Sequence, residues 1–384
     1  MIRNLHIFIL VLLLLNSCIV KFIPAVEEEK ELLVVQGLIT DQPEADTIKL
    51  SKSLPLGQIS DVKPVSGCIV KISDDLGNIY NLKEFVAGTY VTDPENFRGV
   101  IGRSYTLQIS TAGSNNNLNY ESYPIEMTEV PSIDSIYYEK IATEQASENF
   151  AGVDACQIYL DTKDPSDNCR FFRWDFSETW ELRLRFSVPN NTCWITKQSQ
   201  NINIKSTAAF DEARINRFPI NYISNATDRL KTKYSILVNQ YSINEDEFNY
   251  WAKIQNVAVQ VGGLYDIIPA SVQSNISCIE NPAEKVLGYF SVSAKSSKRI
   301  FIQNNFAGII DPYANCVTDT IQTDNPQGLN TTIWILLAHV CSFPCIPWYE
   351  ATTHKECTDC TLRGSNIKPD FWTDDKKLIV KKVL

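Results

Sequence analysis

Five residues near the C-terminus have the types and the spacing of a metal site or a redox centre. Cys341 and Cys345 form a C-x3-C pair, Cys357 and Cys360 form a C-x2-C pair, and His354 lies between the two pairs. Four thiolates around a tetrahedral ion make a common structural zinc site, so this spacing permits zinc. A C-x2-C pair can also be a redox-active dithiol, and cysteines can form disulfides. These alternatives place different demands on the compartment in which the protein folds.

The N-terminus predicts that compartment. Arg3 precedes an apolar run at residues 7–15, which has the length of a signal peptide and is too short for a membrane-spanning helix of about 20 residues. The run ends in LNSC (residues 15–18), the pattern of a bacterial lipobox, whose cysteine is diacylated and becomes the first residue of the mature chain. This pattern makes Cys18 the predicted lipidation site and residues 1–17 the predicted signal peptide. Several acyl chains on Cys18 would anchor the protein stably in a membrane. An ordinary secretory signal with a chance cysteine is the alternative.

Composition narrows the class of protein. The 384-residue chain has 35 Lys and Arg against 45 Asp and Glu, which gives a formal net charge of −10. An acidic chain with scattered basic residues lacks the electrostatic footprint of a nucleic-acid-binding protein. The length predicts two or three domains. No apolar stretch after Cys18 is long enough to span a bilayer, and the longest, residues 333–340, is predicted to be a buried strand.

The first folded domain is predicted at residues 31–128. Residues 18–30 precede it as a lipidated tether that contains a short acidic run. Short β-rich segments then alternate with turn residues, and DDLGN at residues 74–78 is a hairpin signal. Strands at intervals of about ten residues predict an immunoglobulin-like β-sandwich. The clearest predicted strands are residues 32–39, 47–50, 68–73, 79–82 and 104–110.

The rest of the chain, residues 129–384, is predicted to be a larger antiparallel β-rich domain with a cysteine-rich closing segment. Apolar and polar residues alternate in the segments 172–176 and 180–186, which is the period of a strand with one buried face. Trp174 and Trp180 are therefore predicted to lie in a sheet core. The alternative is an exposed platform for stacking a sugar, with Trp194 as a further member.

One helix is predicted in this domain. Residues 242–245 (SINE) fit a capping box, and Phe248 and Trp251 follow at helical spacing. The helix is predicted to end at residues 262–263 or earlier. We expect it to pack on the sheet, and a helix that binds a partner is the alternative.

Motifs that would indicate an enzyme are missing from the sequence. His339 and His354 are the two histidines of the predicted mature chain, and no H-E-x-x-H, G-x-S-x-G or Gly-rich phosphate loop occurs. Asp161, Asp164 and Asp167 have a spacing that could hold calcium, but the loop lacks the glycine and the terminal glutamate of an EF-hand, which favours a solvated turn. A catalytic carboxylate pair has no local signature and stays open. We predict that the protein is not an enzyme and holds no metal or cofactor.

The predicted compartment favours one interpretation of the cysteines. The chain has eleven cysteines, and the even number left beside Cys18 favours disulfides in an exported protein. Zinc and redox chemistry remain the alternatives, although the residues after Cys360 do not open an apolar helix as a redox pair would. Cys68 is expected to be left unpaired. The closing segment is predicted to be braced by disulfides and anchored by Phe371 and Trp372. The disulfide candidates, whose pairing stays open, are Cys156, Cys169, Cys193, Cys278, Cys316, Cys341, Cys345, Cys357 and Cys360.

Several stretches along the chain resemble the Bacteroidota lipoproteins grouped as domain of unknown function 4249. That family usually has Gly-Gly after its C-x2-C stretch, where this chain has Gly364-Ser365. The resemblance implies an outer-membrane lipoprotein, commonly encoded beside a TonB-dependent receptor that imports nutrients, and it implies no catalytic residues. The stretches are LVVQGLITDQP (33–43), PVSGCIVKISDDLGNIYNL (64–82), GVIGRSYTLQI (99–109), VPSIDSIYYE (130–139), NPAEKVLGYFSVSA (281–294) and CTDCTLRGSNIKPDFW (357–372).

These observations predict a non-enzymatic lipoprotein, held in the outer membrane at the cell surface, that assists a TonB-dependent receptor in capturing or admitting a ligand. One alternative is a surface glycan-binding protein or hydrolase, whose site would be a cleft lined by exposed aromatic residues and two carboxylates. Another is a structural component of a surface assembly. Nucleic acid is not an expected partner.

Overall fold

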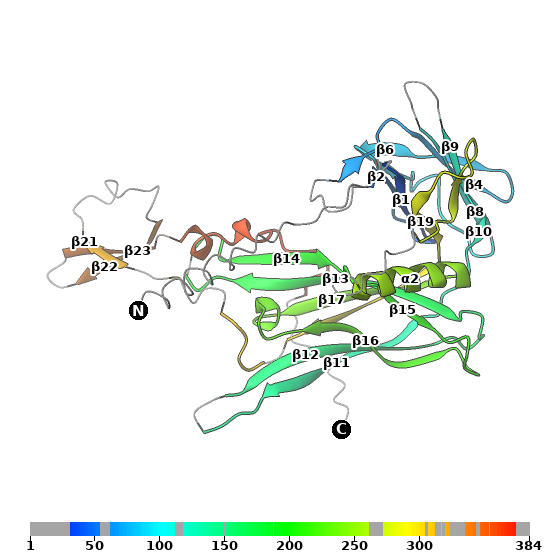
Figure 1. Cartoon of the computed structure of the whole chain (residues 1–384). Helices are drawn as coiled ribbons and strands as arrows, with labels where there is room; N and C mark the ends of the chain where they lie inside the picture. The colour runs from blue at the N-terminus through cyan, green and yellow to red at the C-terminus, as the bar shows by residue number, and fades with distance from the viewer. Residues whose placement is uncertain are drawn as a thin grey trace, which may run out of the picture.

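The computed structural model describes residues 31–373, apart from residues 54–61, 112–117, 149–150, 187, 261–271, 304–305, 312–315, 317–318, 323–334, 343–345 and 353. The predicted signal peptide, Cys18 and the tether lie outside the described residues. The described chain is mainly β, with several antiparallel sheets and one α-helix, α2 (Glu245–Gln260), as expected (Figure 1). Of the helices in this part, none combines the length and the apolar character needed to cross a membrane.

Two sheets form the first β-sandwich. Every strand pair in them is antiparallel except β1 with β19, which is parallel. One sheet has the order β19 (Val286–Val292), β1 (Leu33–Ile39), β2 (Thr47–Lys52), β7 (Thr89–Val91) and β6 (Lys83–Val86), with β3 (Lys63–Pro64) beside β2. The other has the order β18 (Ile276–Cys278), β9 (Asn119–Ser122), β8 (Ser104–Ser110), β4 (Ile69–Asp74) and β5 (Ile79–Asn81), with β10 (Ile125–Glu126) beside β8.

Period-two alternation builds the core of this sandwich. In β8, Tyr105, Leu107 and Ile109 are buried while the residues between them are half-buried. The predicted hairpin is present between β4 and β5. Its turn forms because the Asp74 carboxylate accepts hydrogen bonds from the backbone N–H groups of residues 76 and 78, at 3.0 and 2.9 Å. Gly77 supplies the positive φ of 84° that the turn requires.

The first sandwich is built from two separate segments of the chain. β18 and β19 lie far along the sequence, after α2, yet β19 completes one sheet beside β1 and β18 completes the other beside β9. Residues of both strands belong to the same buried core as β1 and β8. This placement corrects the expectation that residues 129–384 form the second domain alone. The physical reason is that the sheet edges at β1 and β9 are paired only when this later segment returns to them.

A buried carboxyl group makes the first sandwich sensitive to pH. Asp46 is 8 % exposed and accepts hydrogen bonds from the backbone N–H and the hydroxyl of Thr40, both at 3.1 Å. Burial raises the pKa of Asp46 from 3.8 to about 7. Because the pKa of Asp46 is higher in the folded state than in the unfolded state, protonation of this carboxyl group stabilises the fold. The contribution is complete below about pH 3.8 and is lost as pH rises through 7. We expect the wild-type free energy of unfolding to fall by about 2.5 kcal/mol from this source between about pH 5 and pH 7.5.

Replacing the acid with its neutral amide, Asp46→Asn, should remove this component of the pH dependence. Denaturant unfolding of both proteins at the two pH values measures it. Asp134→Asn, which alters an exposed carboxylate, is the matched control and should leave the wild-type slope unchanged. A pH dependence that persists in Asp46→Asn would refute the assignment.

A second β-sandwich follows. One sheet has the order β11 (Ile133–Glu144), β12 (Val153–Lys163) and β16 (Arg214–Ile223). The facing sheet has the order β14 (Thr192–Gln198), β13 (Phe171–Arg183), β17 (Tyr234–Ser242) and β20 (Lys295–Ile302), with β15 (Asn203–Ser206) beside β13. A separate three-stranded sheet has the order β21 (Asp319–Gln322), β23 (Ile346–Thr352) and β22 (Ile335–Ser342). β22 confirms that the apolar run at residues 333–340 contains a strand, which begins at Ile335.

The predicted strands 172–176 and 180–186 are parts of one strand, β13, which ends at Arg183. The alternation that separated them is interrupted because residues 178–182 are buried on both faces. Glu181, placed on the exposed face by the sequence pattern, is 9 % exposed. Trp174 and Trp180 are 1 % and 4 % exposed, which confirms the prediction that they belong to the core.

Helix α2 lies between the two sandwiches (Figure 1). The ring of Phe248 is 5.4 Å from that of Phe171 on the second sandwich. Tyr250 is part of the core of the first sandwich. The predicted capping residue is corrected: Asn244 caps the helix by accepting a hydrogen bond from the Glu247 backbone N–H at 2.8 Å. The Ser242 hydroxyl instead donates to the backbone oxygen of Thr128 at 2.7 Å.

Candidate functional site

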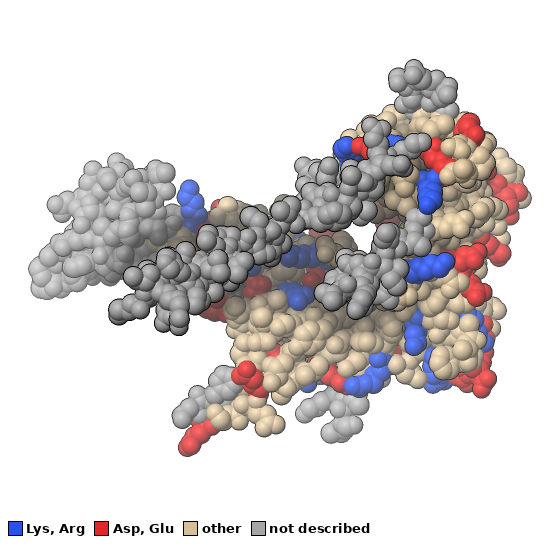
Figure 2. Space-filling model, in the orientation of Figure 1, with Lys and Arg blue, Asp and Glu red and all other residues tan. Residues whose placement is uncertain are grey.

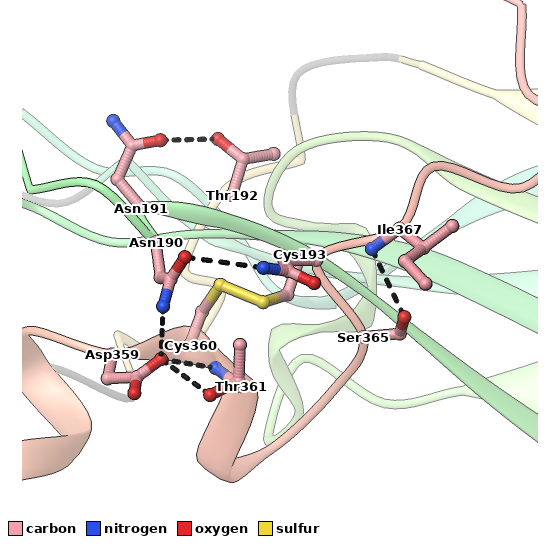
Figure 3. Close-up of a disulfide and its surroundings, with 10 residues drawn as sticks. Asn190, Asn191, Thr192, Cys193, Asp359, Cys360, Thr361, Ser365 and Ile367 are labelled. Carbon is pink, nitrogen blue, oxygen red and sulfur yellow. Dashed lines mark hydrogen bonds between the residues drawn. A yellow bond between two sulfur atoms is a disulfide. The ribbon is translucent and has the colours of Figure 1, made fainter.

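The closing segment is held to the second sandwich by two disulfides. Cys360, in the 3-10 helix η4 (Cys360–Leu362), is bonded to Cys193 of β14, with 5.7 Å between the Cα atoms (Figure 3). Cys357, at the end of the 3-10 helix η3 (Lys355–Cys357), is bonded to Cys316, with 5.9 Å between the Cα atoms. Cys357 and Cys360 therefore have different partners, so they do not form a C-x2-C redox pair.

Other disulfide candidates are corrected by the structure. Cys156, Cys169 and Cys278 are buried thiols rather than members of disulfides. Burial raises the pKa of Cys156 and of Cys169 to about 12, so both thiols are protonated and unreactive at neutral pH. The local sequence around these thiols did not distinguish them from bonded cysteines, because a disulfide requires two Cβ atoms to meet in the fold.

The structure describes the remaining cysteines to different extents. Cys345 lies outside the described residues, and of Cys341 only the backbone, in β22, is described. Cys68 is half-buried, and its Sγ donates to the Val65 backbone oxygen at 3.9 Å. No group of three or more potential metal ligands occurs within the part of the chain that the structure describes. Cys357 and Cys360, two of the four thiols of the zinc alternative, are committed to sulfur–sulfur bonds.

Backbone pairing continues from the disulfide along β14. Trp194 and Ser365 exchange two hydrogen bonds, from N to O at 2.8 Å and back at 3.0 Å. The carboxylate of Asp359 caps η4 by accepting from the backbone N–H of Thr361 at 3.0 Å, and Asn190 donates to the same oxygen at 3.2 Å (Figure 3). The closing segment thus pairs with β14 through an isolated antiparallel β-bridge.

The close approach of this segment to β14 requires a glycine. A Cβ atom on Gly364 would lie 2.7 Å from the Trp194 backbone oxygen and 2.8 Å from Cγ1 of Ile195. Both distances are shorter than van der Waals contact, and the first involves backbone that cannot turn away. We expect Gly364→Ala to lower the free energy of unfolding by about 1–3 kcal/mol, as measured by denaturant titration.

Ser365→Ala, at the next residue of the segment, is the control for this change. It removes only a hydroxyl that accepts from the Ile367 backbone N–H at 3.1 Å and should cost less than about 1 kcal/mol. Equal effects of the two substitutions would show that the close approach at Gly364 is not what constrains the segment.

The two predicted anchors follow the segment. Trp372 is 4 % exposed, and its ring centroid lies 5.6 Å from that of Phe301 and 6.3 Å from that of Trp194. Phe371 is 36 % exposed, with the Arg299 guanidinium 3.5 Å from its ring centroid. Trp372 is thus the buried anchor, and Phe371 contributes a partly exposed cation–π contact.

The sugar-stacking alternative loses its main support. Trp174 and Trp180 are buried, and the Trp174 indole donates to the Gln240 side chain at 2.9 Å. Trp194 is half-buried, and its indole nitrogen is inaccessible. The three tryptophans therefore do not form an exposed platform.

The aspartates with calcium-like spacing do not converge. Asp164 accepts from the backbone N–H groups of residues 166, 168 and 169 at 3.0, 2.9 and 2.7 Å. Asp161 accepts from the Arg217 backbone N–H at 2.7 Å, and Asp167 from that of Ala213 at 2.6 Å. Each carboxylate holds a different backbone segment, which accounts for the spacing without a metal ion.

The buried carboxylates of the second sandwich are also bound by neighbours. Glu178 is 7 % exposed, and its Oε2 accepts from the Tyr234 hydroxyl at 2.8 Å and from Arg229 at 2.9 Å. Burial, followed by the charge of Glu178, raises the pKa of Tyr234 well above 10. Asp228 pairs with Arg363 of the closing segment at 2.8 Å. Both carboxylates contribute to structure rather than face an open cleft.

A cleft of about 350 Å³ lies beside α2. One wall is α2, and the others are the chain at Tyr123–Ile125, the segment 272–275 and Tyr289 of β19. Sequence reasoning missed this site, because its walls are far apart along the chain. Asp246 is the one carboxylate among the described residues of its lining, so the pair of acids required of a glycoside hydrolase is not met there.

The family model described as "Domain of unknown function (DUF4249)" matches residues 20–299. The chain belongs to this family. The matched residues cover the first sandwich and much of the second, and they end before Cys316 and the closing segment. No curated protein matches the chain. Membership confirms the resemblance to domain of unknown function 4249.

Proposed function

We propose that this DUF4249 protein is a non-enzymatic lipoprotein of the outer membrane that assists a TonB-dependent receptor in capturing or admitting a ligand. The observation that carries the proposal is the lipobox at residues 15–18 behind an apolar run of signal-peptide length. Lipidation of Cys18 would hold the two sandwiches at a membrane surface by an acidic tether.

The fold is compatible with this role. Disulfides are typical of proteins that fold in an oxidising, exported setting, and two of them fix the closing segment. On the face shown in Figure 2, the acidic and basic side chains of the described residues are interspersed over both sandwiches, without a broad basic patch. Such a surface favours a protein or small-molecule partner over nucleic acid.

Replacing the predicted lipidation site, Cys18→Ser, should abolish incorporation of labelled palmitate and release most of the protein from the membrane fraction. The reason is that a thiol is the site of diacylation and that the acyl chains supply the membrane affinity. Fractionation and fluorography of native cells measure both effects. Cys68→Ser is the control and should leave labelling unchanged. Retained labelling in Cys18→Ser would refute the lipobox.

The receptor partnership is tested by affinity purification of the wild-type protein from native outer membranes. We expect a TonB-dependent receptor to co-purify in near-stoichiometric amount. The reciprocal purification of that receptor should recover this lipoprotein. Absence of the protein from the purified receptor would count against the accessory role, whatever the outcome for lipidation.

A further inference from the structure

The cleft beside α2 contains two buried tyrosines whose polar ends are not used by the protein. Tyr250 of α2 and Tyr289 of β19 are 8 % and 7 % exposed, and their ring centroids are 4.8 Å apart. Both line the cleft, and within the described residues neither hydroxyl has a hydrogen-bond partner. Burial raises the pKa of both groups above 10, so at neutral pH each remains a phenol that can donate and accept.

Neither hydroxyl oxygen is among the inaccessible side-chain atoms that lack a partner, so both reach the open space of the cleft that their residues line. Two such hydroxyls at one cleft are therefore available to donate to and accept from a molecule that enters it.

Further polar groups line the same space. Asp246, Asn249 and Lys253 are exposed and stand three and four residues apart on one face of α2, and Gln273 faces them from the opposite segment. Tyr123 is 61 % exposed at the same cleft, so one face of its ring is free to stack. The lining thus combines donors and acceptors with one exposed aromatic ring, that of Tyr123.

The backbone of the opposite wall, by contrast, is already paired. The Tyr123 N–H donates to the Asn275 backbone oxygen at 3.0 Å. The Asn275 side chain exchanges two hydrogen bonds with the backbone of Phe290, at 2.8 and 3.0 Å. A peptide that bound by adding a strand would need free backbone groups at these positions, so recognition at this cleft is assigned to its side chains.

We propose that the cleft between α2 and the first sandwich binds a small neutral saccharide. A hydroxyl of a sugar both donates and accepts, as do the amide and phenol groups that meet it here, and the apolar face of a pyranose fits an exposed ring such as Tyr123. The volume of about 350 Å³ lies at the lower end of the range for ligand sites, which suits a mono- or disaccharide. The biological meaning of this inference rests on the capture role proposed above, whereas the binding itself does not require a receptor.

Titration of the purified, detergent-solubilised full chain tests the proposal. The probes are glucose, galactose, mannose, N-acetylglucosamine and the disaccharides maltose and lactose, with dialanine as the peptide comparison. Binding is followed by saturation-transfer NMR and by isothermal titration calorimetry. We expect saturable binding of at least one saccharide. Tyr289→Phe and Asp246→Asn should each weaken it about 3- to 10-fold, since the first removes a hydroxyl and the second replaces one charged acceptor oxygen with an amide donor.

Tyr222→Phe is the matched control, because Tyr222 is 48 % exposed on β16, and it should bind as the wild type does. Melting curves establish that each variant is folded, and Asp246→Asn, on the helix surface, decides the outcome if a tyrosine variant is unstable. No binding by any saccharide, binding that the cleft variants leave unchanged, or binding of dialanine alone would overturn the proposal. None of these results alters membrane anchoring or receptor co-purification, which test the proposed function separately.

Discussion

Replacing Cys193 and Cys360 together with serine is expected to lower the free energy of unfolding by about 5 kcal/mol. The bond joins residues 167 positions apart, and the entropy that a disulfide removes from the unfolded chain grows with the length of the loop it closes. The loss should appear in denaturant titrations of the oxidised proteins. It should be accompanied by release of the closing segment from β14, visible as faster hydrogen exchange at the Trp194 amide, which donates to Ser365.

The second disulfide provides an internal comparison. Cys316 and Cys357 are 41 positions apart, so the same relation gives about 4 kcal/mol for the double replacement. Cys169→Ser, at a buried thiol, is the control for loss of a sulfur without loss of a bond. Alkylation of the unreduced, unfolded protein should leave these four cysteines unmodified. Modification of Cys193 or Cys360 under those conditions would contradict the pairing.

Replacing Glu247 with alanine is expected to lower the free energy of unfolding by about 3–5 kcal/mol, the range for breaking a buried ion pair. Glu247 is fully buried, and its Oε1 accepts from the Ser291 hydroxyl at 2.7 Å and from the Trp251 indole at 3.0 Å. The same oxygen lies 3.8 Å from Nε of Arg173 on the second sandwich. The substitution therefore removes one side chain of α2 that contacts both sandwiches, and it leaves the Arg173 charge without this partner.

Glu247→Gln separates charge from hydrogen bonding. The amide oxygen can still accept from Ser291 and Trp251, so a smaller loss than for alanine is expected, and the difference measures the attraction to Arg173. Ser291→Ala removes one neutral partner and should cost about 1–3 kcal/mol, because it leaves part of a buried charge unsatisfied. Denaturant titration with tryptophan fluorescence follows all three. A loss below about 1 kcal/mol in Glu247→Ala would show that the link carries little of the stability.

The link at Glu247 also bears on how the molecule works. The Ser293 hydroxyl donates to the Ser242 backbone oxygen at 2.6 Å, and the Lys295 backbone N–H donates to Asp41 at 2.9 Å. Together with α2, these contacts hold the two sandwiches against one another near the cleft. A binding site assembled from both the helix and the first sandwich needs such support, because its walls must keep their spacing before the ligand arrives.

Much of the local structure was predictable because it depends on neighbours in sequence. Alternation with a period of two placed the strands β1, β2, β4, β5 and β8, and the DDLGN turn fixed the hairpin between β4 and β5. Helical spacing after residue 245 located α2. The cap was assigned to the wrong residue, because Ser242 and Asn244 are both good capping residues and only the contact with Thr128 removes Ser242 from that role.

The candidate sites were predictable only in part. The type of chemistry at the closing segment followed from the compartment that the N-terminus indicates, whereas the partners Cys193 and Cys316 did not. The cleft beside α2 had no signal in the sequence: Tyr250 and Tyr289 have the spacing of core residues, and their unused hydroxyls can be recognised only when the surroundings are known.

The sequence by itself determined the β-rich class, the positions of most of the strands predicted from it, the helix and the family. Tertiary structure alone decided that β19 returns to pair with β1 in parallel, that four of the cysteines bond in two specific pairs, and that α2 joins two cores. The physical reason is the same in each case. Periodicity and turn chemistry act over a few residues, whereas sheet edges, sulfur pairs and cleft walls are completed by segments up to about 250 residues apart, as between Leu33 and Val286, whose meeting depends on the whole chain.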